Sequence, residues 1–296
     1  MATVCRNSTT RDRSRDGVGS ELARTTVAAM SDLGRLAVIG VGVMGEALLA
    51  GAGRAGFDDV VVADAAPGRA QQVAQQYDAT AASSADAVTD ADVVLLAVKP
   101  QYMAQALEQI APGLSAGAVV VSVAAGVTTA YLEGRLPDGV AVVRAMPNTP
   151  ALIGEGVTAI SAGTHADDAD LDIAERLLRG AGTVVTVPES LQDAVTAVSG
   201  SGPAYLFYLA EAMVDAGVGL GVPRATATQL VAQTLRGAAG LLSQEEAHPT
   251  LLRERVTSPG GTTAAAIAAL DAGAVRADVA EAMRAAARRS QELSGQ

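Results

Sequence analysis

A chain of 296 residues with 32 acidic and 21 basic side chains carries a net charge of −11, which argues against binding nucleic acid or an anionic membrane surface through a basic face. Hydrophobic residues make up 49% of the chain but aromatic residues only 2%, so the core must be built from Ala, Val and Leu. The single cysteine, Cys5, excludes an intrachain disulfide or a cysteine-rich metal site. We therefore expect a cytoplasmic protein of two domains with no bound metal.

Residues 1–33 differ in composition from the rest of the chain, because arginines are mixed with acidic residues, Ser and Thr and no apolar periodicity is present. We expect a disordered arm here. It lacks the apolar core of a secretory signal, and its acidic residues disfavour a mitochondrial transit peptide. Met30 lies just ahead of the first predicted strand, which leads to the hypothesis that translation can start there and that the arm is dispensable.

From residue 34 to residue 188 strand and helix patterns alternate, which predicts an α/β domain with a mostly parallel sheet. An uncharged stretch, residues 113–132, has the length of a membrane span, but glycines interrupt it and Val119–Val121 is typical of a buried strand. We expect no membrane span. The predicted strands are 36–39, 60–63, 93–98, 119–123, 140–144, 157–161 and 183–187. The predicted helices are near 43–55, 67–77, 102–110, 128–135 and 167–180.

The first predicted strand, Leu36–Ile39, runs into a G-x-G-x-x-G motif formed by Gly40, Gly42 and Gly45, and good helix formers follow. We expect Gly40 to make the turn, Gly42 to let the backbone approach a pyrophosphate, and Gly45 to let the helix pack on the strand. A glycine-rich turn that binds nothing is the alternative. The domain is thus predicted to be a Rossmann-like, dinucleotide-binding one. Its candidate cofactor-binding residues in this turn are Gly40, Val41, Gly42, Val43, Met44 and Gly45.

A carboxylate follows the second predicted strand. Asp64 comes directly after residues 60–63, about where such a site places an acidic residue on the ribose. It would accept the ribose hydroxyls of NADH and repel the extra phosphate of NADPH, whereas Arg69 could stack on adenine or meet that phosphate. On charge alone we expect NADH to be favoured, with NADPH also used.

Further strand ends are expected beside the glycine turn, because ligands bind outside the carboxyl ends of parallel strands. Lys99 is the only lysine in the chain, and it is either a cofactor contact or a solvated residue. Asn148, between Pro147 and Pro150, either presents its amide to the nicotinamide or belongs to a rigid structural turn. These strand ends add Ala97, Val98, Lys99, Pro100, Ala124, Ala125, Gly126 and Asn148 to the candidate cofactor site.

The second half of the chain, residues 189–296, changes to long Ala-rich helical patterns with hardly a strand pattern. Apolar stripes on two of these helices exceed what one small helical domain can bury, so we expect at least a dimer. Pro203 suits the first turn of a helix that Ser201 or Gly202 can cap. The predicted helices are near 189–199, 203–218, 223–243, 249–256 and 262–270, with a last one at 276–293.

A polar, glycine-containing segment, Thr257–Thr263, precedes one of these helices. Hydroxyl side chains, two glycines and a helix N-terminus together make a receptor for a carboxylate, because free backbone N–H groups supply the positive end. This would let an acidic protein bind a small anion without a buried arginine. A flexible loop with a helix cap is the alternative.

Several motifs together resemble those of the pyrroline-5-carboxylate reductase family, whose members complete proline synthesis. The similarity covers residues 35–293, nearly everything after the arm. Its most specific motifs are the two in the helical region, Ser199–Tyr205 and Val256–Thr263, since the glycine motif is shared with many dehydrogenases. The motifs are Gly40–Gly45, Ala97–Pro100, Ala124–Gly126, Met146–Pro150, Ser199–Tyr205 and Val256–Thr263.

The resemblance implies NADH- or NADPH-dependent reduction of 1-pyrroline-5-carboxylate, with hydride transfer to the cyclic imine carbon. It also implies a helical dimerisation domain, a substrate site where helical domains of two subunits meet, and assembly of dimers into decamers. Thr263 would hydrogen-bond the ring nitrogen as the catalytic group, and Ser258 with the backbone of Gly260, Gly261, Thr262 and Thr263 would hold the carboxylate. Glu246 falls where family members carry a glutamate, although it is equally a surface residue.

Three alternatives stay open at this point. A reductase of a related cyclic imine would share every motif. A β-hydroxyacid dehydrogenase requires a lysine in its second domain, and no lysine follows Lys99. A dinucleotide-binding sensor without catalysis would have no need of a carboxylate-binding loop.

Overall fold

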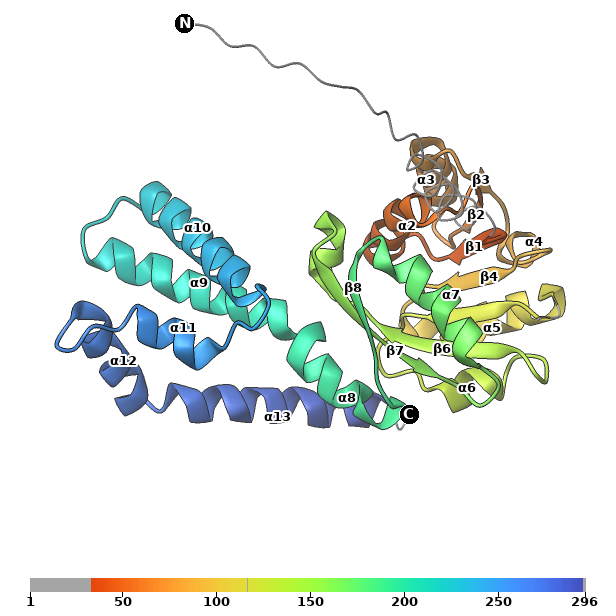
Figure 1. The fold of residues 1–296 in the computed structure, drawn as a ribbon. Helices are drawn as coiled ribbons and strands as arrows, with labels where there is room; N and C mark the ends of the chain where they lie inside the picture. Colours follow the sequence, from red (N-terminus) through yellow and green to blue (C-terminus); the bar gives the residue numbers. More distant parts are fainter. Residues whose placement is uncertain (1–32, 116, 295–296) are drawn as a thin grey trace, which may run out of the picture.

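A computed structural model describes residues 33–115 and 117–294. An α/β part comes first and a helical part follows, and the last helix runs back toward the first part (Figure 1). The predicted arm lies outside the described residues except for Leu33, which is buried in the core. The proposed start at Met30 lies outside them as well.

A single eight-stranded sheet forms the centre of the α/β part, and the six strands from β1 to β6 pair in parallel. β7 is antiparallel to β6, and β8 is parallel to β7. The prediction of a mostly parallel sheet is therefore confirmed. The strand order is β3-β2-β1-β4-β5-β6-β7-β8. The strands are β1 (Arg35–Ile39), β2 (Asp59–Ala63), β3 (Thr80–Ala81), β4 (Val93–Leu96), β5 (Val119–Ser122), β6 (Ala141–Met146), β7 (Gly156–Ala162) and β8 (Gly182–Thr186).

Helices cover both faces of the sheet, because successive strand residues point to opposite sides. Leu36 and Val38 of β1 pack in the cluster that includes α2 (Val43–Ala55), α3 (Arg69–Tyr77) and α7 (Asp168–Arg179). Ala37 and Ile39 pack in the cluster that includes α4 (Ser84–Ala87), α5 (Met103–Ile110) and α6 (Thr129–Glu133). Short 3-10 turns complete this part: η1 (Pro100–Tyr102), η2 (Ala111–Gly113) and η3 (Thr149–Ile153).

The helical part begins after β8. The region predicted as one helix over 189–199 is instead η4 (Glu189–Leu191), α8 (Gln192–Val195) and the π-helical turn η5 (Thr196–Gly200). Ser201 makes no side-chain capping bond to the helix that follows, contrary to one of the two caps expected there. The remaining helices are α9 (Gly202–Gly219), α10 (Arg224–Leu242), α11 (Pro249–Arg255), α12 (Thr262–Ala272) and α13 (Val275–Ser294).

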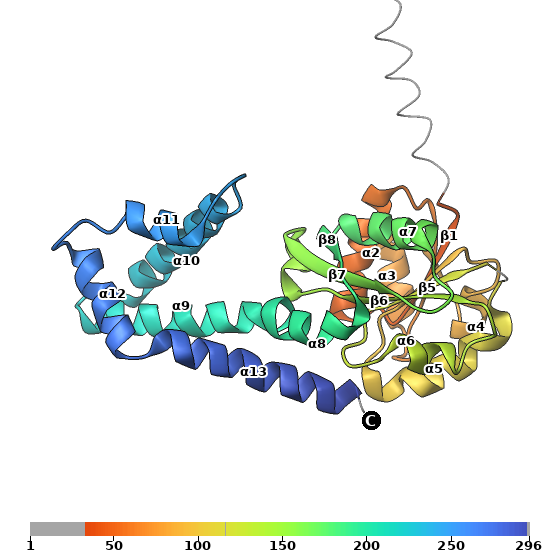
Figure 2. The same ribbon diagram turned by 60° about the horizontal axis from the view of Figure 1, so that its bottom comes forward.

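The helical part has little core of its own. No residue of α9 is buried, and Phe207 and Tyr208 are 68% and 77% exposed. α9 packs against α10, while α13 returns beside η5 and α8 to the sheet (Figure 2). Apolar surface of this extent calls for a second protein surface to cover it. None of the helices in residues 33–115 and 117–294 is both long and apolar enough to cross a membrane.

Candidate functional site

The turn after β1 has the geometry that its glycines predict. Gly40 has a φ of +91°, which favours glycine, and its N–H donates to the carbonyl of Ala63 over 2.8 Å. A Cβ on Gly45 would overlap the carbonyl oxygen of Gly40, so the close approach of α2 to the turn requires glycine. At Gly42 a Cβ would meet no atom within 4 Å. The space over Gly42, at the start of α2, is therefore open to a phosphate.

Asp64 holds this turn. Its Oδ2 accepts the backbone N–H of Val41 over 2.8 Å, and its Oδ1 accepts the N–H of Ala66 over 2.8 Å. Each oxygen keeps a second lone pair with which it can accept a ribose hydroxyl. The carboxylate predicted to bind the cofactor thus also fixes the backbone of the glycine turn.

Arg69 is held across the turn by an ion pair that the sequence did not suggest. Its Nε donates to the carbonyl of Val41 over 2.9 Å, and its Nη2 is paired with the carboxylate of Glu46. Tyr77 donates to the other oxygen of Glu46 over 3.4 Å. Burial, followed by the charge of Glu46, raises the pKa of the Tyr77 hydroxyl, which therefore stays a donor. Most of the Arg69 guanidinium is therefore engaged in contacts within the protein.

The carboxyl ends of β1, β4 and β5 lie side by side, because these strands are parallel neighbours. This brings the segment 97–100 beside the glycine turn, and the segment 124–126 lies one strand further along the same edge. Lys99 is exposed at the start of η1, Ala124 is buried, and Gly126 has a φ of +76°. The remaining members of the two segments, Ala97, Val98, Pro100 and Ala125, line the same edge of the sheet.

Asn148 is occupied by structural partners. Its Oδ1 accepts the N–H of Val157 over 3.0 Å, and its Nδ2 donates to the carbonyl of Ser199 over 3.1 Å. One N–H of the amide is left over for a ligand. Asn148 therefore links β7 to the start of the helical part, in line with the structural-turn alternative.

The segment ahead of α12 is an uncapped helix N-terminus. No side chain caps α12, and the first N–H to find a backbone acceptor in the helix is that of Ala265, which donates to Gly261 over 3.2 Å. The N–H groups of Thr262 and Thr263 precede it and have no acceptor within the helix. Gly260 has a φ of +69°, and Ser258 is exposed beside it. Glu246 is exposed in the loop between α10 and α11, where it has a φ of +61°.

Within one chain the glycine turn and the α12 segment are far apart. In both views α11 and α12 lie at the end of the helical part that is remote from α2 and β1 (Figures 1 and 2). A ligand held at Gly42 cannot touch Thr263 of the same chain in this arrangement. The predicted cofactor residues are therefore gathered together, whereas the predicted substrate residues form a separate group.

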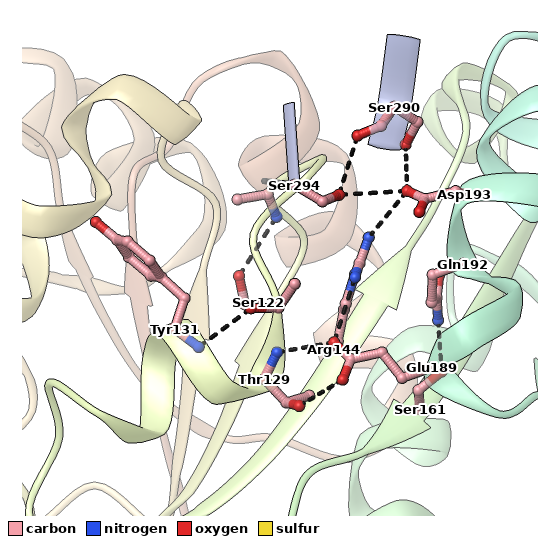
Figure 3. A network of polar contacts seen from close by, with 12 residues as sticks. Ser122, Thr129, Tyr131, Arg144, Ser161, Glu189, Gln192, Asp193, Ser290 and Ser294 are labelled. Atoms are coloured by element: carbon pink, nitrogen blue, oxygen red, sulfur yellow. Dashed lines mark hydrogen bonds and ion pairs between the residues drawn. The ribbon is translucent and has the colours of Figure 1, made fainter. Parts of the chain in front are cut away.

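A buried polar network joins the two parts of the chain, and none of its side chains belongs to a predicted site (Figure 3). Arg144 of β6 is 4% exposed and its Nη1 donates to Oε1 of Glu189 over 3.2 Å. Glu189 also accepts the N–H and hydroxyl of Thr129, over 2.8 and 2.6 Å. Asp193 lies 3.9 Å from Nη2 of Arg144 and accepts the hydroxyl of Ser290 over 2.6 Å. An arginine inside an apolar strand was the available signal, because a buried charge requires partners.

A mostly parallel sheet with a glycine turn between β1 and α2, and a carboxylate at the end of β2, are typical of a dinucleotide-binding fold. A family model described as NADP oxidoreductase, coenzyme F420-dependent, matches residues 35–126. A second model, described as pyrroline-5-carboxylate reductase dimerisation, matches residues 189–293.

Relatives and solved structures extend this match over nearly the whole chain. A pyrroline-5-carboxylate reductase of Mycobacterium tuberculosis is 46% identical over 286 residues, covering 88% of this chain and 97% of its own. A pyrroline-5-carboxylate reductase structure from Coxiella burnetii is 35% identical with a TM-score of 0.84, covering 89% of this chain and 99% of its own. A Plasmodium falciparum pyrroline carboxylate reductase structure with NADP bound is 27% identical, with a TM-score of 0.79 and coverages of 89% and 99%.

The chain belongs to the pyrroline-5-carboxylate reductase family, a family of oxidoreductases. Its helical part is a dimerisation domain, so the protein self-associates. The exposed apolar surface of α9 agrees with this, and the prediction of at least a dimer is confirmed.

Proposed function

We propose that this protein reduces 1-pyrroline-5-carboxylate to L-proline with NADH or NADPH, the last step of proline biosynthesis. Hydride passes from the nicotinamide to the ring carbon of the protonated C=N bond, the electron pair of that bond moves to nitrogen, and the dinucleotide leaves oxidised. The protonated imine already carries positive charge, so positioning contributes more than acid catalysis. The observation that carries the proposal is the uncapped N-terminus of α12, a receptor for the substrate carboxylate in a chain with a dinucleotide turn.

Each group of predicted residues has a role in this reaction. The turn Gly40–Gly45 holds the pyrophosphate, and Asp64 accepts the ribose hydroxyls with its free lone pairs. Ser258 and the backbone from Gly260 to Thr263 hold the carboxylate. The Thr263 hydroxyl orients the ring nitrogen. Glu246 lies in the loop ahead of α11, at the substrate end of the helical part.

The active site is assembled from two chains. The remoteness of α12 from α2 within one chain supports this, because the exposed apolar faces of α9 and α10 allow a partner to bring its own α12 close. We also infer from the resemblance that the dimers assemble into decamers and that the enzyme works in the cytoplasm. The domain boundary belongs between residues 188 and 189, supported by the end of β8 at Thr186 and the start of η4 at Glu189.

We propose that NADH is the preferred donor. Arg69 is the one basic side chain predicted at the ribose, and it is paired with Glu46. This carboxylate largely neutralises the positive charge that would attract a 2′-phosphate. Asp64 repels that phosphate directly.

One assay tests the proposed reaction. The purified protein is mixed with NADH or NADPH and with the five- or six-membered cyclic imine carboxylate, and the nicotinamide absorbance is followed. We expect rapid oxidation with 1-pyrroline-5-carboxylate and L-proline as the product. Absence of oxidation with this imine, alongside intact dinucleotide binding, would overturn the proposed function and favour a sensor.

A further inference from the structure

The last turn of α13 lies against the loop that follows β5. A Cβ placed on Gly126 would come within 3.0 Å of Cβ of Leu293 and 3.3 Å of its carbonyl carbon. A side chain on Gly126 would crowd the end of α13, and Gly126 adopts a φ of +76° that favours glycine. The position of this loop is therefore set by where α13 ends.

Hydrogen bonds to one carboxylate hold that end of α13 in place. Asp193 of α8 accepts the hydroxyl of Ser290 over 2.6 Å and that of Ser294 over 3.3 Å with the same Oδ1 (Figure 3). Ser290 is 4% exposed, and it is the only buried residue of α13 within the described residues. Hydrogen bonds to a charged acceptor are stronger than neutral ones.

The carboxylate is itself fixed by the sheet. Arg144 extends from β6 between Glu189 and Asp193, and its side chain is almost fully buried. Glu189 uses both oxygens on Thr129, at the start of α6. The end of α13 is thus connected through Asp193 and Arg144 to β6, the strand next to β5.

We propose that Asp193 and Ser290 are positioning residues for the dinucleotide, because they hold the last turn of α13 against the loop Ala124–Gly126 and so fix the cofactor side of the crevice. This inference rests on the proposed function, which assigns that loop to the cofactor. Neither residue contacts the reacting atoms. When the bond between them is lost, the end of α13 lifts and the loop loses its support.

Two variants test the inference, and dinucleotide binding is the readout. Asp193→Asn removes the charged acceptor, and the double variant Ser290→Ala/Ser294→Ala removes both donors. Each is titrated with NADH, and the Kd is taken from nicotinamide fluorescence. We expect the Kd and the KM for the dinucleotide to rise about three- to tenfold, with kcat at saturating dinucleotide nearly unchanged. If Asp193→Asn does not fold, the double variant, which removes no charge, carries the test.

Glu292→Gln is the matched control, because Glu292 lies in the same turn and is exposed in a pair with Arg289. It should bind NADH as the wild type does. A lower melting temperature with an unchanged Kd in both test variants would reduce the network to a structural role and overturn the inference. Because binding is measured without the imine, a wild-type protein that binds NADH but does not reduce 1-pyrroline-5-carboxylate would refute the proposed function alone. A wild type that binds no dinucleotide would refute both.

Discussion

The carboxylate of Asp64 accepts a 2.8 Å hydrogen bond from the backbone N–H of Val41, so the end of β2 fixes the glycine turn that follows β1. Arg69 holds the same residue from its other side, through the carbonyl of Val41. The turn is therefore set in place before any ligand arrives. A preorganised backbone binds a pyrophosphate without a further ordering cost.

Gly42→Val should weaken cofactor binding, because a branched side chain would fill the open space over the turn. We expect the KM for the dinucleotide to rise at least about tenfold, since a rigid backbone cannot move away. Gly53→Ala is the matched control: it lies in α2, the helix that Gly42 precedes, is exposed with open space around it, and should stabilise the protein by about 0.5–1 kcal/mol without changing that KM. If Gly42→Val kept the wild-type KM for the dinucleotide, the turn would not be part of the cofactor site.

Glu46→Gln should shift the cofactor preference toward NADPH. Loss of the carboxylate frees the charge of Arg69 to meet a 2′-phosphate, and we expect the ratio of kcat/KM for NADPH to that for NADH to rise about fivefold. Glu108→Gln makes the same change of net charge on α5, on the opposite face of the sheet, and should leave the ratio unaltered. An equal ratio in the two variants would show that Arg69 takes no part in choosing the cofactor.

Thr263→Ala should lower kcat about ten- to a hundredfold while the Kd of the dinucleotide stays within about twofold of the wild type, because the hydroxyl acts on the imine nitrogen. Thr263→Ser keeps the hydroxyl and should retain most of the activity. Single-turnover measurements with separate cofactor titrations distinguish the two parameters. Parallel losses of turnover and cofactor binding would contradict the assignment.

Tyr208→Glu should break the association of chains, because it introduces a charge on the most apolar exposed helix. Sedimentation at micromolar concentration should show a monomer, and the reductase activity should be lost while NADH binding persists. Gln105→Glu adds the same charge on the exposed side of α5 and should leave the oligomer unchanged. A fully associated, active Tyr208→Glu variant would place the interface elsewhere.

The turn between β1 and α2 was predictable because its parts are local. Gly40, Gly42 and Gly45 fall within six residues, and their spacing dictates a turn and a helix start. Strand β3 and helix α4 were missed because two and four residues carry too little periodicity. The antiparallel pairing of β7 was also unpredicted, since a strand pattern does not record direction.

The network of Arg144 lay beyond sequence reasoning for a different reason. Asp193 and Ser290 are separated by 97 positions, and no spacing rule connects them. Only the buried arginine pointed to partners. Likewise, Arg69 was placed near the ribose, but its pairing with Glu46, 23 positions away, depends on how α3 packs beside α2.

The central claim is that one active site combines the glycine turn of one chain with the α12 segment of another. Co-expression of Gly42→Val and Thr263→Ala chains tests it most directly, when the assay uses a dinucleotide concentration well below the raised KM, so that each variant alone is strongly impaired. If the site is shared, random pairing gives about a quarter of all sites two intact halves (½ × ½), and reductase activity should return to about that fraction of the wild type. A mixture that is no more active than the average of the two variants alone, although mixed dimers have formed, would contradict the claim.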